Sequence, residues 1–540
     1  MNSTVRRVVS KVNKRLSIRL AAGLLAGATL LSSVLGLYRE RLLNSMYFDT
    51  YKVGLDAYTA AFSVPDFMFF ILVSGALSVT FIPVFNARLA SGQKDSAWQL
   101  SSSLINFMAL ITLIASILII IFADPLVSIM VPGFSESGHG LAVSMMRVIA
   151  VNPFLFAVAT VIASMQQAVG RFTFFALAPT IYNIGIIIGA LWFTNGINLF
   201  GWQVFEGGIM GVALGVVLGS ILQLLVSSIG LIGFGFDYRF KIYWKNKGFR
   251  EVLRILPARS LDQGIDYVNG FVENNIASHM AAGTVRAYQQ ATTLHTVPIN
   301  LIGVAISTAA FPKMTEHLGM GRPDLFRSDL QTILRVIIWL AMPVSAIAFF
   351  GRGYLVNFVK NGGDVMIAGL LGILAIAILF RSVYHIAARS FYAQQDTKTP
   401  LYISLFAIGL NIFLAIYFTA SLGFGVYGLA WAQAIVAVVE VVILFAVMSW
   451  RIPKLFDAKF VQAISRMASA TAIMSIVTYV SVTMLPLQAS DQSFLASFPK
   501  FVLISIISMS FYVALCKLFK IEEVNPVLKK LYAVTFGKKL

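Results

Sequence analysis

Long apolar segments recur along the whole chain and are separated by short polar loops. About 20 apolar residues are enough for a helix to cross the hydrocarbon core of a bilayer, and we count fourteen segments of that kind. The pattern therefore predicts an all-α polytopic membrane protein with fourteen transmembrane helices. They are expected at residues 20–48, 56–88, 98–131, 139–168, 172–194, 207–234, 255–281, 286–316, 328–351, 365–394, 399–420, 424–449, 461–485 and 498–519.

Composition agrees with this assignment. Hydrophobic residues make up 58% of the chain and charged residues only 12%, whereas a soluble domain carries about 25% charged residues. The first apolar segment is too long for a cleavable signal peptide. The single cysteine, Cys516, excludes an intrachain disulfide and a CxxC metal site.

The positively charged residues alternate between loops. With the N-terminus inside, the inner loops contain most of the Lys and Arg residues, and the outer loops at 131–139, 194–207 and 420–424 contain none. Positive loops stay in the cytoplasm, so we expect a multi-pass protein with both termini cytoplasmic. The net charge of +18 then reflects topology and contact with anionic membrane lipids, and it does not indicate nucleic-acid binding.

The chain contains an internal duplication. The motif GIMGVA at 208–213 recurs as GVYGLA at 425–430, and a Gln-Gln pair at 166–167 followed by Asn183 recurs at 394–395 and Asn411. Copies six helices apart have the same orientation, which predicts two parallel six-helix lobes around a central cavity. The expected parts are an N-terminal lobe (1–234), an amphipathic cytoplasmic linker (235–254), a C-terminal lobe (255–450), and two extra helices with a basic tail (451–540).

Polar side chains inside the seventh segment share one helical face. Their i,i+3 and i,i+4 spacing predicts that they line a cavity, where they would also be able to bind a coupling cation. The alternative is that they pair with one another and only hold helices together. The residues are Arg259, Asp262, Asp266, Asn269 and Glu273.

The tenth segment carries three basic residues on one face. Arg381 lies near mid-span, where a charge is expensive, and is therefore predicted to bind an anion. His385 is either a cavity residue or a satisfied interior histidine. Arg389, near the inner end, is expected to extend toward the membrane surface.

In the first lobe, Arg39 and Asp56 lie toward the outer side of neighbouring helices, so a cross-helix pair is expected. Glu40 and Arg41 are expected at the membrane interface. Pro65 and Pro83 interrupt the second segment and are candidate hinges, because proline frees backbone carbonyls beside a cavity.

No catalytic motif is present. The chain has no GxxxxGK[ST], HExxH or GxSxG pattern, so we expect a transporter and not an enzyme, without catalytic residues, metal site or cofactor. Its energy would come from a coupling cation, the membrane potential or the substrate.

Several motifs resemble the MurJ/MviN family of the multidrug/oligosaccharidyl-lipid/polysaccharide exporter superfamily. The similarity covers the first twelve helices and lies in SSVLGLYRE at 32–40, Asp56-Ala57, Pro65, GALSVTFIP at 75–83, VPGF at 131–134, Arg171-Phe172, APT at 178–180 with Asn183, and FYAQQDTKTP at 391–400.

The resemblance implies a flippase of the bacterial cytoplasmic membrane, which moves lipid II from the inner to the outer leaflet by alternating access. It implies a cationic substrate site containing Arg39 and Asp56, to which we add Ser33, Ser74, Arg259 and Arg381 as substrate-binding residues. Ser33, Ser74, Phe69, Phe70 and Thr293 stand where the family usually has charged residues.

Three alternatives remain open. The first is a flippase for another undecaprenyl-pyrophosphate glycolipid, and the second is an ion-coupled exporter of the same superfamily. The third is a transport-inactive scaffold that acts with cell-wall synthesis proteins. The charge of the cavity discriminates between them, because a phosphate carrier needs net positive side chains there.

Overall fold

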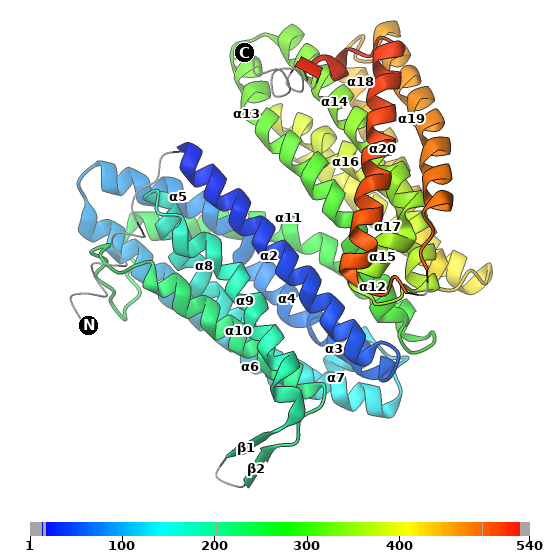
Figure 1. Ribbon diagram of the computed structural model, residues 1–540. Coiled ribbons are helices and arrows are strands. Elements are labelled where there is room, and N and C mark those ends of the chain that lie inside the picture. The colour runs from blue at the N-terminus through cyan, green and yellow to red at the C-terminus, as the bar shows by residue number, and fades with distance from the viewer. Residues whose placement is uncertain (1–12, 14–17, 200–201, 489, 527, 530–540) are drawn as a thin grey trace. The chain divides into compact units, whose positions relative to one another are not determined.

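The computed structural model describes residue 13 and residues 18–199, 202–488, 490–526 and 528–529; within these ranges the side chains at 18–19, 21–22, 74–80, 255 and 257–266 are not described. The described chain is almost entirely helical and divides into two compact units, residues 1–286 and 287–540. Figure 1 shows the helices of both units.

The first unit contains α2 (Ile18–Tyr47), α3 (Lys52–Ala61), α4 (Ser63–Phe69), η1 (Phe70–Ser74), α5 (Gly75–Ala90), α6 (Lys94–Met130), α7 (Glu136–Ile149), α8 (Asn152–Ala168), α9 (Thr173–Leu191), η2 (Phe193–Asn195), β1 (Ile197–Leu199), β2 (Trp202–Phe205), α10 (Met210–Ile229), α11 (Lys247–Ser278) and the start of α12 (Thr284–Ile299). The second contains the rest of α12, η3 (Asn300–Val304), α13 (Ala305–Gly319), α14 (Pro323–Phe350), α15 (Arg352–Val359), α16 (Val365–Ala393), α17 (Lys398–Ile416), η4 (Tyr417–Ser421), α18 (Val426–Arg451), α19 (Ala458–Met484), α20 (Phe494–Leu518) and η5 (Glu522–Val524).

The all-helical membrane architecture is confirmed. Within the described residues, twelve helical stretches are long and apolar enough to span a bilayer. The predicted spans at 20–48 and 255–281 correspond to α2, with 30 residues, and α11, with 32 residues, which fall outside those twelve. The predicted lobe boundaries remain a prediction.

Two details differ from the expectation. Helix α11 begins at Lys247, inside the predicted linker, because the Asn246 side chain accepts hydrogen bonds from the backbone N–H groups of Gly248 and Phe249 and so caps the helix. The loop between α9 and α10 contains a short antiparallel hairpin, in which Asn198 pairs with Gln203. The hairpin extends past the ends of both helices (Figure 1).

In both units the first glutamine of the duplicated Gln-Gln pair binds a neighbouring helix. The Gln166 amide at the end of α8 donates to the Ser227 carbonyl of α10 at 2.8 Å, and the Gln394 amide after α16 donates to Met448 Sδ of α18 at 3.1 Å. The two acceptors differ in kind, one being a backbone carbonyl and the other a side-chain sulfur.

Two proline-containing spans have irregular backbones. The second span breaks between α3 and α4 and then forms the π-helix η1 five residues after Pro65, whereas α5 continues through Pro83. The span that contains Pro298 forms the π-helix η3 directly afterwards. A π-turn changes the hydrogen-bond ladder and is frequent at functional sites, so Pro65 remains a candidate hinge.

Glycines allow α9 and α10 to pack closely. A Cβ atom on Gly189 would lie 2.4 Å from the Gly215 Cα, and one on Gly185 would lie 2.2 Å from the Gly219 Cα. These distances are far shorter than any normal carbon contact, so the two backbones meet only because side chains are absent at these four positions.

The Gly215→Val variant should destabilise the first unit by about 1–3 kcal/mol, the usual penalty for overpacking a close-packed interior. Thermal unfolding of the purified protein in detergent measures the effect. Gly409→Val is the matched control, because a Cβ at Gly409 of α17 meets nothing within 4 Å. Equal melting temperatures for the two variants would contradict this packing.

Asp396, in the loop before α17, stabilises the start of that helix. Its carboxylate accepts hydrogen bonds from the backbone of Lys398 and from Thr399, and it forms an ion pair with Arg451 at 2.7 Å. Burial raises the pKa of this carboxyl, but the hydrogen bonds from Thr399 and Arg451 outweigh it and hold the pKa at about 2.

An unfolded aspartate titrates near pH 4, so the lower folded pKa stabilises the protein above that pH. This contribution is lost as the pH falls from about 4 to about 2. The Asp396→Asn variant should be less stable than the parent at pH 7, by about 1 kcal/mol as for a lost helix cap. Melting temperatures measured from pH 7 to pH 3 should show this gap narrowing below pH 4; a constant gap would contradict the assignment.

Candidate functional site

Arg39 lies on α2, and its guanidinium is held from two sides. It donates to the Glu40 carboxylate, and its Nη1 donates to Asn183 Oδ1 at 3.0 Å. The Asn183 amide nitrogen in turn donates to the carbonyls of Ser32 and Pro179. With 22% of its side chain exposed, Arg39 is oriented by these contacts but still open to a ligand.

A second arginine approaches the same carboxylate. Arg286, near the start of α12, donates from Nη2 to Glu40 Oε2 at 2.7 Å, and from Nε and Nη2 to Asn44 Oδ1. Its side chain is only 4% exposed. Glu40 and Asn44 are four residues apart and therefore share one face of α2. Each oxygen of Glu40 thus receives one guanidinium, and the cluster carries net positive charge.

Asp56 of α3 binds backbone instead of side chain. Its carboxylate accepts hydrogen bonds from the N–H groups of Gly283 and Arg286, so it caps the first turn of α12 with a negative charge. The predicted pair between Arg39 and Asp56 is wrong, because Glu40 is the nearer carboxylate for Arg39. Glu40 is largely buried, with 15% of its side chain exposed, and its interfacial position stays a prediction.

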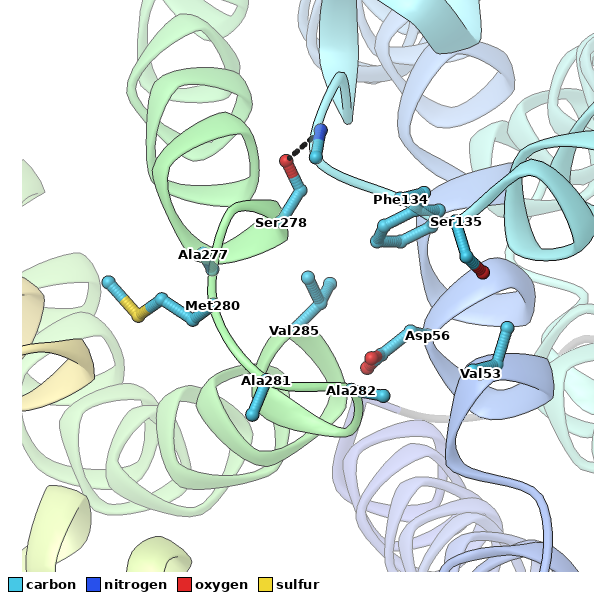
Figure 2. A pocket seen from close by; sticks show the side chains of 11 residues that line it. Val53, Asp56, Phe134, Ser135, Ala277, Ser278, Met280, Ala281, Ala282 and Val285 are labelled. Carbon is cyan, nitrogen blue, oxygen red and sulfur yellow. Dashed lines mark hydrogen bonds between the residues drawn. The ribbon is translucent and has the colours of Figure 1, made fainter.

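A cavity of about 210 Å³ lies beside Asp56 in the first unit. Figure 2 shows the Asp56 carboxylate between the α11–α12 loop and α3. The lining also includes the VPGF motif, where the Gly133 N–H donates to Ser278 Oγ at 3.1 Å (Figure 2). A Cβ on Gly133 would lie 2.4 Å from the Ser278 carbonyl oxygen, so the glycine allows this loop to pack on α11. The lining residues are Val53, Asp56, Gly133, Phe134, Ser135, Ala277, Ser278, Met280, Ala281, Ala282 and Val285.

Only part of the predicted polar stripe on the seventh helix is described. The Asn269 amide donates to Glu273 Oε1 at 2.9 Å, and Glu273 is buried, which matches the pairing alternative for these two residues. The stripe's other members and one further candidate lie outside the described side chains: Arg259, Asp262, Asp266 and Ser74.

The substituted family positions have ordinary local roles. Ser33 Oγ donates to the Thr29 carbonyl, and Thr293 Oγ1 donates to the Gln289 carbonyl, both on exposed helix faces. Phe69 packs edge-on against Phe156, and Phe70 packs against Tyr267. Both side chains therefore take part in aromatic packing in the second span.

In the second unit, Arg381 of α16 pairs with Glu440 of α18, with Nη1 to Oε2 at 2.9 Å. His385 lies next to the Tyr384 ring. Arg389 donates to the Val304 carbonyl and to Ser307 Oγ, so its guanidinium binds the π-helix region. That it extends toward the membrane surface stays a prediction.

Sequence reasoning missed three charged or polar partners that the fold brings to these sites. Arg286 and Asn44 are not among the site residues predicted from the sequence. Glu440 was also overlooked, although it is the single acidic residue within 426–451, and a lone intramembrane carboxylate is a recognisable signal. Among the described residues, no group of three or more His, Cys, Asp or Glu side chains gathers where it could hold a metal ion.

Known proteins of similar sequence belong to one family of membrane transporters. Residues 50–498 match the sequence profile of the family described as "Lipid II flippase MurJ". The chain is 26% identical over 510 residues to a probable lipid II flippase MurJ of Thermotoga maritima, covering 93% of this chain and 97% of that protein. It is 23% identical over 487 residues to the probable lipid II flippase MurJ of Vibrio cholerae, covering 86% and 89% of the two chains.

Solved structures show the same fold. A lipid II flippase MurJ in an inward closed conformation superposes with a TM-score of 0.71 at 24% identity, covering 91% of this chain and 99% of that one. An inward-facing multidrug resistance MATE family transporter of the MOP superfamily gives a TM-score of 0.65 at 14% identity, covering 85% and 100%.

Removing the shared carboxylate should destabilise the protein. In Glu40→Gln, the buried Arg286 loses its ionic partner, and breaking a buried pair in this way typically costs about 3–5 kcal/mol. Asp124→Asn is the control, because the Asp124–His139 pair is largely exposed and such pairs contribute about 0–1 kcal/mol. Thermal unfolding compares the two, and an equal loss of stability in both would argue against a buried cluster.

Proposed function

Because the chain belongs to the lipid II flippase MurJ family, we propose that it moves lipid II from the inner to the outer leaflet of the bacterial cytoplasmic membrane. It is a multi-pass transporter and not an enzyme. The observation that supports this function most directly is the cluster formed by Arg39, Glu40 and Arg286 among apolar helices. Among these three side chains two are guanidinium groups, and Arg39, the more exposed of the two, is the cation that an anionic substrate can reach.

The chemistry of the substrate suits this cluster. Lipid II is an undecaprenyl-pyrophosphate glycolipid, and arginine binds phosphate oxygens through strong, charge-assisted hydrogen bonds. Arg39 is the more exposed arginine, and it keeps N–H groups beyond those bonded to Glu40 and Asn183. We assign phosphate binding to Arg39, whereas Arg286, which is buried, supports the position of Glu40.

The same cluster connects substrate binding at Arg39 to the cap at the start of α12. Arg286 contacts Glu40 through its side chain and Asp56 through its backbone N–H. A phosphate that draws Arg39 away from Glu40 would therefore also disturb the cap on α12. We propose that the Asp56 cap holds the outer end of the first unit closed, and that its release belongs to alternating access.

The finer topology is part of the proposal. We include α2 and α11 as spans, which gives fourteen transmembrane helices arranged as two six-helix lobes with two additional helices, and both termini in the cytoplasm. Helix α2 carries Arg39 and Glu40, and an isolated charge at mid-membrane costs about 2.5–3.5 kcal/mol. Because Glu40 pairs with Arg39 and Arg286, the charges on α2 are compatible with its insertion into the membrane. A coupling cation or the membrane potential would supply the energy.

The segment 238–247 supports contact with anionic lipids. Phe240, Tyr238 and Trp244 are exposed, and Lys241, Lys245 and Lys247 lie among them. Aromatic and basic side chains together favour an anionic membrane surface. The loop is held in place by α6, because the Ser102 and Ser103 hydroxyls accept hydrogen bonds from the backbone N–H groups of Arg239 and Tyr243.

One observation favours a second candidate, a flippase for a different polyprenyl-pyrophosphate glycan. Ser33, Phe69 and Thr293 are neutral and make only local contacts, so fewer charges are available at these positions for the headgroup. Binding compared between lipid II and other undecaprenyl-pyrophosphate glycans separates the two candidates.

Replacing the native flippase in a depleted bacterium tests the proposed function. The wild-type chain should restore growth and lipid II exposure on the outer leaflet. Arg39→Ala should reduce lipid II export at least about tenfold, the effect of one charge-assisted hydrogen bond. Arg147→Ala is a matched control, since Arg147 contacts only an exposed carbonyl, that of Ile120, among the described residues. Normal expression without restored export by the wild type would refute the function.

A further inference from the structure

The second unit contains an ion pair in the middle of its apolar helices. Arg381 occupies the central turns of α16 (Val365–Ala393), and Glu440 those of α18 (Val426–Arg451). Two charges at such a depth are costly unless they are paired or face water. The pair therefore needs an explanation beyond the general packing of these helices.

Its two partners differ in exposure. The Glu440 side chain is only 3% exposed, whereas that of Arg381 is 30% exposed. An exposed guanidinium at mid-span is incompatible with a lipid-facing position, so the open side of Arg381 must face a hydrated space. A pair that serves only to join two helices would bury both partners.

Glu440 is held by a polar framework from a third helix. Ser404 of α17 donates from its hydroxyl to Glu440 Oε1 at 2.9 Å, and its Oγ lies 3.1 Å from the Tyr384 hydroxyl. The Arg381 guanidinium also lies over the Tyr384 ring, 5.9 Å from its centroid. The carboxylate and the ring together fix the direction of the guanidinium.

Most of the donors of Arg381 remain available. Arginine has five N–H donors, and in the described part of the chain the one hydrogen bond from Arg381 runs from Nη1 to Glu440. The other side of the guanidinium can therefore bind two oxygens of one anion in the fork geometry that arginine offers to phosphate.

We propose that Arg381, oriented by Glu440, Ser404 and Tyr384, forms a second phosphate-binding site, located in the unit 287–540. Its ligand is a phosphate group of the lipid-linked pyrophosphate, so the inference rests on the proposed function. In each unit, a glutamate then orients an arginine for phosphate binding: Glu40 orients Arg39, and Glu440 orients Arg381. Glu440 is a positioning residue and does not itself contact the substrate.

Adhesion alone is a weaker explanation for the pair. Apolar residues of similar volume can replace a buried ion pair without loss of stability, so joining α16 to α18 does not require charges. The Ser404 hydroxyl donates to the Glu440 carboxylate, and the Tyr384 hydroxyl lies next to that of Ser404. Such orientation of the carboxylate is needed only if the position of the guanidinium matters.

Binding measurements on the full-length protein in nanodiscs test the site. The probes are undecaprenyl pyrophosphate and undecaprenyl alcohol, which share a tail and differ in the phosphates. Arg381→Ala should bind the pyrophosphate about tenfold more weakly and the alcohol equally well. Arg352→Ala is the control, because Arg352 is engaged by the Phe349 carbonyl and ring and should bind both probes as the wild type does.

Double variants separate positioning from adhesion. Because Glu440 acts through Arg381, the single variant Glu440→Gln should weaken pyrophosphate binding. The double variant with Arg381→Ala should bind pyrophosphate no more weakly than Arg381→Ala itself. A double-mutant cycle detects this non-additivity. The exchange Arg381→Glu with Glu440→Arg should restore the melting temperature but not pyrophosphate binding. Recovery of binding in the exchanged protein would overturn the proposal.

Failure of this site is distinguishable from failure of the proposed function. If the wild type transports lipid II and Arg381→Ala binds undecaprenyl pyrophosphate normally, the second site is refuted and the flippase function stands. If Arg381→Ala loses pyrophosphate binding, the site is supported even where the wild type exports a glycan other than lipid II.

Discussion

The structure depends on satisfying charges inside helices that are otherwise apolar. Glu40 does this for two arginines at once, because each of its oxygens accepts a hydrogen bond from a different guanidinium. Without that carboxylate, α2 would carry an unpaired Arg39 and α12 a buried, unpaired Arg286. The positive charge needed for a phosphate-bearing substrate can thus remain in the membrane only because an acidic residue stands beside it.

This arrangement joins binding to conformation. Arg286 connects the two sites, because its side chain donates to Glu40 and its backbone N–H donates to Asp56. The cap also closes one side of the cavity next to the VPGF loop. In the second unit, Arg389 connects α16 to the π-helix η3 through the Val304 carbonyl. The Arg286 backbone therefore lies at the first turn of a helix, and the Arg389 side chain binds a π-helix. At such places a helix can move with the least disruption of regular hydrogen bonding.

Sequence patterns were most informative where the physical signal is periodic or repeated. Runs of apolar residues identified the membrane helices, and the repeated Gln-Gln motif identified two glutamines, Gln166 and Gln394, that each bind a neighbouring helix. The resemblance to the MurJ/MviN family selected Arg39 and Asp56 as site residues. Both lie in the cluster around Arg286, although they are not paired with each other.

What the sequence determined by itself is the membrane class, the helical composition and the family, because these follow from hydropathy, local periodicity and short motifs. Only the tertiary structure decided which charges meet. Arg286 lies more than 240 residues along the chain from Glu40 and Asn44, and Arg381 lies 59 residues from Glu440. No local pattern encodes such a pairing. Charge partners depend on distances of about 3 Å across helices, and the packing of those helices is a property of the folded chain as a whole.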